Sequence, residues 1–352
     1  MKLGIIGLSG AGKTTVFEAL TGATGGESAK MEDRIGTITV PDERVDILSK
    51  IYSPQKTIFA KVEYFIPAKK QGKEKDSSQW TGVRDCDALI YVLRNFKQYG
   101  TQEADPAQDI ATLDSELMVN DYMVVEKRLE RLVLDAKRGK KPNPEEITLL
   151  KEALQHLEDE KPLRNFPHIA DSPLLKGYAF LSAKSVLALL NNEDEDSKMP
   201  ESAGFSMTED GKSSTGSSGI EGMVIRGKLE QELSQMSDEE AEDFLTEFNI
   251  TASATDRVII RSYSLLGLIS FFTVGEDEVR AWTIKKETEA LNAADVIHSD
   301  IKQGFIRAEV MSYADLMEAG SFNEAKKKGR ARLEGKTYLV EDGDIINFRF
   351  NV

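Results

Sequence analysis

A glycine-rich segment near the start of the chain constrains the fold more than any other feature of the sequence. Gly7, Gly12, Lys13 and Thr14 fit the pattern G-x-x-x-x-G-K-[ST]. An apolar run over residues 2–6 comes before it and predicts a buried strand, and a helical spacing of apolar residues begins at Lys13. Strand, glycine loop and helix in this order are the context in which such a loop binds phosphate.

The residue types in this loop suit a nucleotide. Glycines let backbone N–H groups turn toward phosphate oxygens, and the start of the following helix adds a partial positive charge. Lys13 is expected to reach the terminal phosphates and Thr14 to ligate Mg²⁺ as the cofactor. The predicted nucleotide-binding residues of the loop are Gly7, Ser9, Gly10, Ala11, Gly12, Lys13, Thr14 and Thr15.

Composition excludes several classes of protein. The chain has 352 residues, a formal net charge of −15 and one cysteine, Cys86. The length predicts two or three domains, and one cysteine allows neither an intramolecular disulfide nor a multi-thiolate zinc site, which favours a reducing, cytoplasmic location. No apolar run approaches the ~18 residues that span a bilayer, so no membrane segment is expected. The net negative charge repels nucleic-acid phosphates, so any contact with RNA needs a locally basic patch.

Two helical stripes in the middle of the chain predict a long hairpin. Residues 105–139 carry apolar side chains at helical spacing, Pro142 and Pro144 break the pattern, and a second stripe runs from Ile147 to Leu157. The two stripes can pack as antiparallel helices. Basic residues gather toward the tip, and we interpret them either as a solvated face or as a phosphate-contacting patch: Lys127, Arg128, Arg131, Lys137, Arg138, Lys140 and Lys141.

The rest of the chain predicts strands and helices in alternation, hence a mostly parallel sheet. Strands are expected at 35–40, 57–66, 88–94, 185–190 and 223–225, with a helix from Leu229 and another over about 255–272. Residues 193–219 are rich in charge, serine and glycine and are predicted to form a flexible surface loop. After residue 278 the pattern becomes strand-like, and it ends with alternating apolar residues from Ile346 to Val352, which predicts a separate small α+β unit.

Several single residues are expected to be structural. Acidic neighbours should disfavour the thiolate of Cys86, so we do not predict a nucleophile there. His156 is expected at the surface, Trp80 in packing, and Phe350 in a strand core.

Five stretches of the sequence resemble the Obg-like ATPases, also called YchF proteins. Besides the phosphate loop, the similarity rests on residues 35–46, 280–284, 297–309, 333–336 and 340–352, and it extends over essentially the whole chain. The resemblance implies an α/β fold with a Ras-like P-loop NTPase domain, an inserted helical hairpin and a C-terminal TGS domain of β-grasp type. The implied bounds are 1–104 and 166–275 for the P-loop domain, 105–165 for the hairpin and 276–352 for the TGS domain.

The family's functional residues carry over unevenly. By this resemblance, Lys30 stands where the family has a magnesium-sensing threonine, and Ile66 and Lys69 stand where it has the Asp and Gly of D-x-A-G. Both switch segments are therefore degenerate, and Lys30 or Lys69 is a candidate to contact the γ-phosphate in place of a metal contact.

Two pairs of residues are candidates for recognition of the base. YchF proteins carry N-x-x-E, associated with ATP, where guanine-specific relatives have N-K-x-D. Here Asn191 with Asp194, or Asn192 with Glu195, can fill that frame, and neither pair includes the lysine. This favours adenine, while both ATP and GTP stay open as purine ligands.

The resemblance implies a monomeric, ribosome-associated factor of translation. We expect a protein that binds ATP or GTP but hydrolyses it slowly or not at all, because the magnesium-linked carboxylate is replaced. The alternative is a non-catalytic nucleotide-binding scaffold that does not act on ribosomes. A P-loop kinase is disfavoured because the sequence shows no basic lid motif.

Overall fold

The computed structural model describes residues 1–23, 32–68, 75–97, 102–200, 205, 220–247 and 253–351. Lys30, Lys69 and most of the segment 201–219 lie outside these residues, so the structure does not test their predicted roles. None of the helices in the described ranges is both long and apolar enough to cross a membrane.

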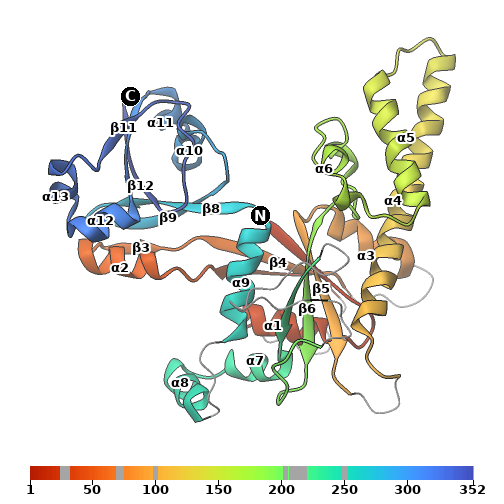
Figure 1. Cartoon of the computed structure of the whole chain (residues 1–352), viewed down its shortest axis with the longest axis horizontal. Coiled ribbons are helices and arrows are strands. Elements are labelled where there is room, and N and C mark those ends of the chain that lie inside the picture. Colours follow the sequence, from red (N-terminus) through yellow and green to blue (C-terminus); the bar gives the residue numbers. More distant parts are fainter. Residues whose placement is uncertain are drawn as a thin grey trace. The chain divides into compact units, whose positions relative to one another are not determined.

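The elements follow one another in the order shown in Figure 1. The strands are β1 (Lys2–Ile6), β2 (Arg34–Thr39), β3 (Lys56–Ile58), β4 (Lys61–Ile66), β5 (Ala88–Asn95), β6 (Ser185–Asn192), β7 (Glu221–Ile225), β8 (Leu268–Val274), β9 (Glu278–Lys285), β10 (Phe305–Ser312), β11 (Arg332–Glu334) and β12 (Asp344–Phe350). The helices are α1 (Lys13–Thr21), α2 (Glu43–Tyr52), α3 (Lys75–Arg84), α4 (Pro106–Lys137), α5 (Pro144–Glu158), α6 (Pro167–Ala170), α7 (Gly227–Leu233), α8 (Asp238–Glu247), α9 (Ala254–Leu265), α10 (Ala290–Ile297), α11 (Ser299–Gln303), α12 (Tyr313–Ala319) and α13 (Phe322–Lys327), with short 3₁₀ turns η2 (Leu163–Asn165) and η3 (Lys176–Tyr178).

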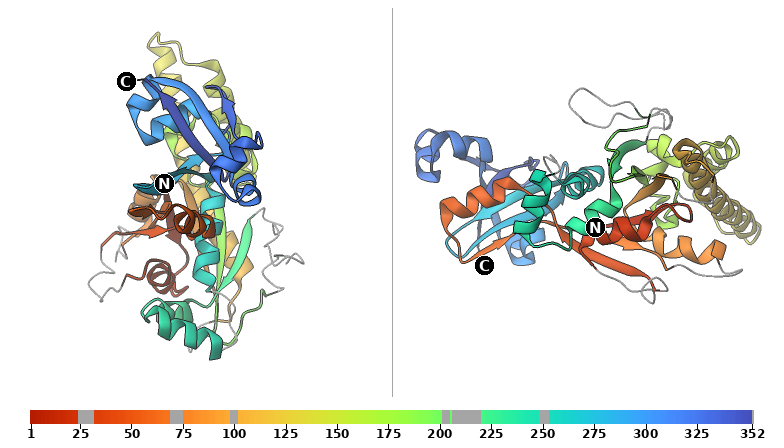
Figure 2. Two further views of the ribbon diagram at one scale, coloured as in Figure 1. Left: turned by 90° about the vertical axis from the view of Figure 1, so that its left-hand side faces the viewer. Right: turned by 90° about the horizontal axis from the view of Figure 1, so that it is seen from below.

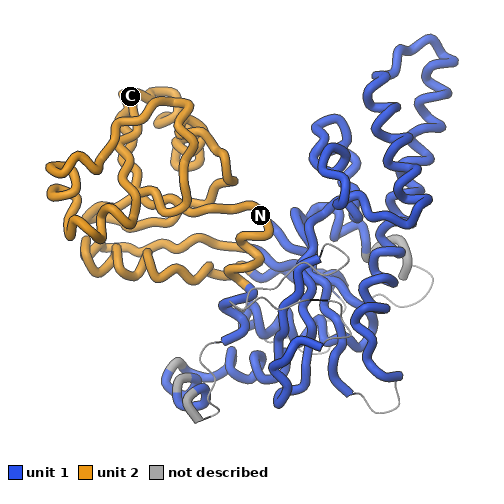
Figure 3. The backbone as a smooth tube through the Cα atoms, viewed as in Figure 1, with its two compact units in different colours: residues 1–36, 63–258 blue, residues 37–62, 259–352 orange. Residues whose placement is uncertain are grey.

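The chain forms two compact units, coloured separately in Figure 3. The first contains residues 1–36 and 63–258, and the second contains residues 37–62 and 259–352. The segment 37–62 is thus grouped with residues 259–352 in the second unit. Pairing accounts for this, since β3 within that segment joins the C-terminal sheet beside β9.

The sheet associated with the first unit has the order β2-β4-β1-β5-β6-β7. β1 pairs in parallel with β4 and β5, and β5, β6 and β7 continue in parallel. This confirms the predicted α/β fold with a mostly parallel sheet. β1 and β5 are almost entirely apolar and buried, as expected for strands covered on both faces.

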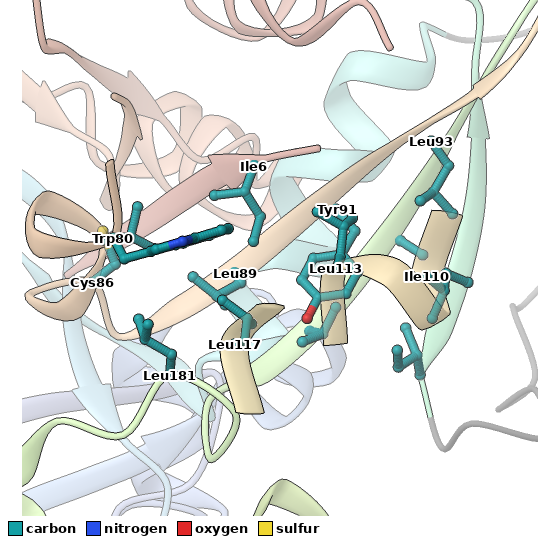
Figure 4. Packing of buried hydrophobic residues seen from close by; sticks show 14 of the residues in the cluster. Ile6, Trp80, Cys86, Leu89, Tyr91, Leu93, Ile110, Leu113, Leu117 and Leu181 are labelled. Carbon is teal, nitrogen blue, oxygen red and sulfur yellow. The ribbon is translucent and has the colours of Figure 1, made fainter. Parts of the chain in front are cut away.

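A large apolar cluster packs on one face of this sheet. Figure 4 shows side chains of α4 closing over β5, with Trp80 and Cys86 beside them. The labelled residues of the cluster are Ile6, Trp80, Cys86, Leu89, Tyr91, Leu93, Ile110, Leu113, Leu117 and Leu181. Trp80 is 5% exposed, which confirms its predicted packing role.

The predicted hairpin is confirmed by α4 and α5, which lie side by side and project from the sheet (Figures 1 and 2). Pro106 and Pro144 stand in the first turns of the two helices, where proline's missing N–H costs no helical bond. Val125, Leu132 and Leu150 lie in the apolar seam between them.

Buried polar contacts join the base of the hairpin to the sheet. Asp114 on α4 accepts hydrogen bonds from Tyr91 on β5 at 2.7 Å and from Arg164 at 2.5 Å. About two helical turns further along, the fully buried carboxylate of Asp121 accepts the backbone N–H groups of Leu181 and Ser182. The long helix is therefore anchored at its base by side chains on one face.

The second unit contains a sheet of order β11-β10-β12-β8-β9-β3. The sheet is mixed: β10 and β12, and β8 and β9, pair antiparallel, whereas β12 and β8, and β3 and β9, pair in parallel. Apolar residues of the sheet, among them Phe271 and Phe348, share one cluster with Ala294 of α10. Arg44 on α2 binds both Asp42 and Asp342 at 2.8 Å, and so holds the segment 37–62 to the strands of this unit.

Three local predictions need correction. The helix expected over 255–272 ends at Leu265 because Gly267 adopts a left-handed φ of 64°, and residues 268–274 form β8 instead. The single strand expected at 57–66 is two strands, β3 and β4, in different sheets. Phe350 is 39% exposed, so it is not a core residue.

Candidate nucleotide-binding site

The glycine segment forms a loop between β1 and α1, as the motif requires. Gly12 is the N-cap of α1 with a left-handed φ of 91°, and Gly10 has a φ of 85°. No described side chain caps this helix end. The N–H groups of Thr14 and Thr15 in the first turn therefore have no helical partner, which makes the loop a suitable cradle for an anion.

Close approaches explain why glycine is needed at two positions. A Cβ added to Gly7 would lie 2.3 Å from the carbonyl oxygen of Val92 on β5, which is backbone and has little room to move. A Cβ added to Gly12 would lie 2.2 Å from the side-chain nitrogen of Asn191. The loop thus packs directly against the carboxyl ends of the neighbouring strands, where ligands bind in parallel sheets of this kind.

The side chain of Lys13 turns back over the loop. Its ammonium donates to the carbonyl oxygens of Gly7 at 2.7 Å and Leu8 at 2.8 Å. It is therefore held above the cradle, where a phosphate oxygen could exchange for one of the carbonyl contacts. Ser9 and Gly10 are exposed at the tip of the loop, whereas Ala11 is buried beneath it.

Asn191 connects the loop to a helix that follows much later in the sequence. Its amide donates to the carbonyl oxygen of Ala11 at 3.1 Å and accepts the N–H of Gly227 at 2.9 Å. The side chain is 5% exposed, so both bonds are shielded from water. Asn191 thereby holds the phosphate loop and the start of α7 together.

The structure places Asn192 differently. Its side chain accepts the amide of Asn95 on β5 at 2.9 Å and donates to the carbonyl oxygen of Lys198 at 2.8 Å. Neither contact involves the loop. Of the two frames left open by the sequence, the structure brings Asn191 and its partner Asp194 toward α7, where Asp194 accepts the N–H of Leu229, while Glu195 is exposed.

Gly227 is a residue of this site that the sequence did not reveal. A Cβ there would lie 2.7 Å from the Asn191 side-chain oxygen, so only glycine admits the observed hydrogen bond. The available signal was a glycine between the end of a strand and the start of a helix. Nothing in the sequence showed that this glycine would face Asn191.

The site offers few protein ligands for a metal. Thr14, the candidate magnesium ligand, lies in the first turn of α1 and is partly exposed. Ile66 ends β4 at 6% exposure and provides no carboxylate. Among the residues described, no group of three His, Cys, Asp or Glu side chains can hold a metal ion. A magnesium ion here would therefore rest on Thr14 and on phosphate oxygens of the nucleotide.

The basic residues at the hairpin tip divide into two groups. Arg128 binds Glu146 at 2.7 Å and Lys140 binds Asp135 at 2.9 Å, so these two are already paired within the hairpin. The remainder are exposed and form no ion pair with another described residue: Lys127, Arg131, Lys137, Arg138 and Lys141. They are the side chains of the tip that can meet a phosphate.

Two further residues differ from their predicted surroundings. Burial raises the pKa of the Cys86 thiol to about 11, and the neighbouring aspartates contribute less than burial does. His156, expected at the surface, is stacked on Phe166 with ring centroids 3.4 Å apart, and its side chain is 19% exposed. Both residues are parts of the packing.

Comparison with known proteins gives consistent similarities over the full length. The family model YchF-GTPase_C, described as "Protein of unknown function (DUF933)", matches residues 268–351. The "Ribosome-binding ATPase YchF" of Bacillus subtilis is 36% identical over 365 residues, covering 99% of each chain. The protein of the same name from Haemophilus ducreyi is 35% identical, covering 100% of this chain and 99% of the other.

Solved structures give the same result. The YchF GTPase of Schizosaccharomyces pombe matches with a TM-score of 0.83 at 28% identity, covering 99% of this chain and 97% of that one. A GTP binding protein from Pyrococcus horikoshii matches with a TM-score of 0.61 at 18% identity, which shows a shared fold.

Proposed function

The chain belongs to the YchF family, and from this premise we propose that it is a cytoplasmic, nucleotide-binding factor that associates with the ribosome. The observation that carries the proposal is the phosphate loop, with Lys13 held over it and Asn191 bound beneath it. The two bacterial relatives that match over the full length are named as ribosome-binding ATPases.

The nucleotide is a purine triphosphate bound through the loop between β1 and α1. Its phosphates lie over the N–H groups of residues 9–15 with Lys13 at the terminal phosphates, and its Mg²⁺ rests on Thr14. Asn191 and Asp194 belong to the base side of the site. Because no lysine follows Asn191 in the position that guanine-specific relatives use, adenine is the preferred base.

The proposed binding is tested by fluorescence titration of the purified chain with labelled ATP and GTP analogues. Lys13→Ala should weaken binding by about tenfold or more, since a charged hydrogen bond contributes about 1.5–3 kcal/mol. Lys327→Ala is the matched control, because its side chain is 73% exposed and its ammonium pairs with Glu324 at the surface. Equal affinities of the two variants would contradict the assignment of the loop.

Hydrolysis is proposed to be slow or absent. Ile66 is a buried apolar side chain where a magnesium-linked carboxylate would stand, and it orders neither metal nor water. Single-turnover measurement at saturating ATP and Mg²⁺ tests this. A rate equal to that of family members with an intact D-x-A-G segment would refute it and leave nucleotide binding untouched.

The hairpin tip is proposed to contact ribosomal RNA. The variant Arg131→Gln, Arg138→Gln, Lys141→Gln should bind ribosomes more weakly in co-sedimentation, and its affinity should fall less steeply with salt. The control removes three exposed charges elsewhere: Lys161→Gln, Lys176→Gln and Lys336→Gln. Unchanged ribosome binding by the tip variant would contradict the RNA contact, and no ribosome binding by any form would favour a nucleotide-binding scaffold instead.

A further inference from the structure

A cavity of ≈ 630 Å³ lies within the second unit, and the nucleotide site does not account for it. Its lining includes five aromatic side chains: Tyr52, Trp282, Phe322, Phe348 and Phe350. Polar side chains of Thr273, Glu278, Asn323 and Asn347 also line it. A cavity of this size that combines apolar walls with a few polar groups is typical of a binding site.

One wall of the cavity is the edge of a strand. β12 pairs with β10 from Ser312 opposite Asp344 to Phe305 opposite Phe350. On its other edge, β12 pairs with β8 only where Ile345 lies opposite Phe272. β8 is the neighbour of β12 in the sheet, but in the part of the chain that the structure describes the two strands share no register pair after Ile345, and the end of β12 borders the cavity.

The hydrogen-bond alternation shows which backbone groups face the open edge. Tyr313 donates its N–H to Gly343 and Asn351 donates its N–H to Gly304, so the odd-numbered residues of this strand face β10. In an antiparallel ladder alternate residues face opposite edges, which turns the N–H and C=O groups of Phe348 and Phe350 away from β10. Among the described residues, neither Phe348 nor Phe350 belongs to a register pair between β12 and β8, so their backbone groups can accept a further strand.

We propose that this open edge of β12 and the adjoining cavity bind an extended peptide segment of a partner protein, which adds to the sheet as a strand. The backbone of the peptide supplies the missing partners for Phe348 and Phe350, and one of its apolar side chains enters the cavity. Strand addition at an exposed sheet edge, with a pocket for alternate side chains, is a general mode of peptide recognition.

Charge at the cavity mouth defines the peptide further. The turn between β8 and β9 carries the exposed Glu276 and Asp277, and Glu278, the first residue of β9, lines the cavity and pairs with Arg280 at 3.8 Å, which leaves this end of the cavity net negative. The peptide that fits is therefore apolar at alternate positions and carries a lysine or arginine at the end that meets this turn.

A nucleic acid fits the cavity poorly. The guanidinium of Arg280 lies 3.7 Å from the ring centroid of Trp282, and Phe271 stacks on the same ring. The indole Nε1 of Trp282 donates to the hydroxyl of Thr273. Trp282 therefore offers little free surface on which a base could stack. The acidic turn also repels phosphate.

The test uses the full-length chain and an array of fluorescein-labelled peptides of about nine residues, the length of an ordinary strand. Valine, isoleucine or phenylalanine alternates with threonine, and the ends are two lysines or two glutamates. A second set carries proline at its centre, which removes a backbone donor. We expect fluorescence anisotropy to show binding of the lysine-ended alternating peptides and none of the proline set.

Two variants locate the binding. Phe350→Lys should weaken it by about tenfold or more, because an apolar contact at the edge of the cavity is replaced by a charge. Leu333→Lys is the matched control, since Leu333 is 56% exposed on β11 and does not line the cavity. Glu278→Lys should shift the preference toward glutamate-ended peptides.

Amide hydrogen exchange of the unmodified chain tests the strand addition without any variant. A bound peptide should slow exchange at Phe348 and Phe350 and leave Asn347 and Arg349, which already face β10, unchanged. The proposal is overturned if no peptide binds, if binding survives Phe350→Lys, or if binding leaves the exchange of Phe348 and Phe350 unaltered. Protection of these amides by a single-stranded oligonucleotide in place of a peptide would also overturn it.

Discussion

Alanine at position 12 should destabilise the first unit through two separable effects. The left-handed backbone at Gly12 costs an alanine about 1–2 kcal/mol. The new Cβ also lies 2.2 Å from the Asn191 amide nitrogen, so this side chain must move and lose its bond to Ala11. Leaving that buried carbonyl unpaired adds about 1–3 kcal/mol, for a total of about 2–5 kcal/mol.

A double-mutant cycle with Asn191→Ala separates the two effects. Asn191→Ala alone leaves Ala11 and Gly227 without their partners and should cost about 2–4 kcal/mol. In that background the Cβ of Gly12→Ala no longer meets an amide, so only the backbone term of about 1–2 kcal/mol is added. The double variant should therefore be about 1–3 kcal/mol more stable than the sum of the single variants predicts.

The assay is urea unfolding followed by the fluorescence of Trp80. The chain has two tryptophans, so a Trp282→Phe background leaves only the buried indole of the first unit as the reporter. Gly22→Ala is the control: Gly22 has a φ of 63° and no atom within 4 Å of an added Cβ. It should cost about 1–2 kcal/mol with or without Asn191. Additivity of Gly12→Ala and Asn191→Ala within about 0.5 kcal/mol would refute the contact on which the reasoning rests.

Three other outcomes follow from the packing. The folded-state pKa of Cys86 is raised to about 11. The stability that the neutral thiol gives the folded state is therefore fully present below the thiol's unfolded pKa, and it is lost as the pH rises toward 11. Cys86→Ala should therefore lose about 2–3 kcal/mol less stability than the parent between pH 8 and pH 11, and identical urea profiles would contradict this. Asp114→Asn leaves Arg164, whose side chain is 8% exposed, without its counter-charge, and should cost about 3–5 kcal/mol in urea unfolding; a loss under about 1 kcal/mol would show that the pair is not buried. Arg44→Lys should destabilise the second unit nearly as much as Arg44→Met, by about 1 kcal/mol, because a lysine cannot bridge two carboxylates with a planar fork; full stability of the lysine variant, measured through Trp282 in a Trp80→Phe background, would contradict the bridge.

The sequence alone determined the features whose signals are local. The phosphate loop, the strand before it and the helix after it are adjacent in the sequence. The structure shows the strand at Lys2–Ile6 and the helix at Lys13–Thr21, with the loop between them. The hairpin was equally predictable, because its apolar spacing repeats over many turns and prolines interrupt it. Family membership followed from motifs spread over the chain.

The tertiary structure alone decided which distant residues meet. Asn191 and Asn192 are neighbours with the same side chain, but successive residues of a strand face opposite sides, so one reaches the phosphate loop and the other reaches β5. The sequence also did not show that β3 belongs to the second sheet, because its partner β9 lies more than two hundred residues away in the sequence. Periodicity reports which side of an element is buried, and it contains no information about the element that buries it.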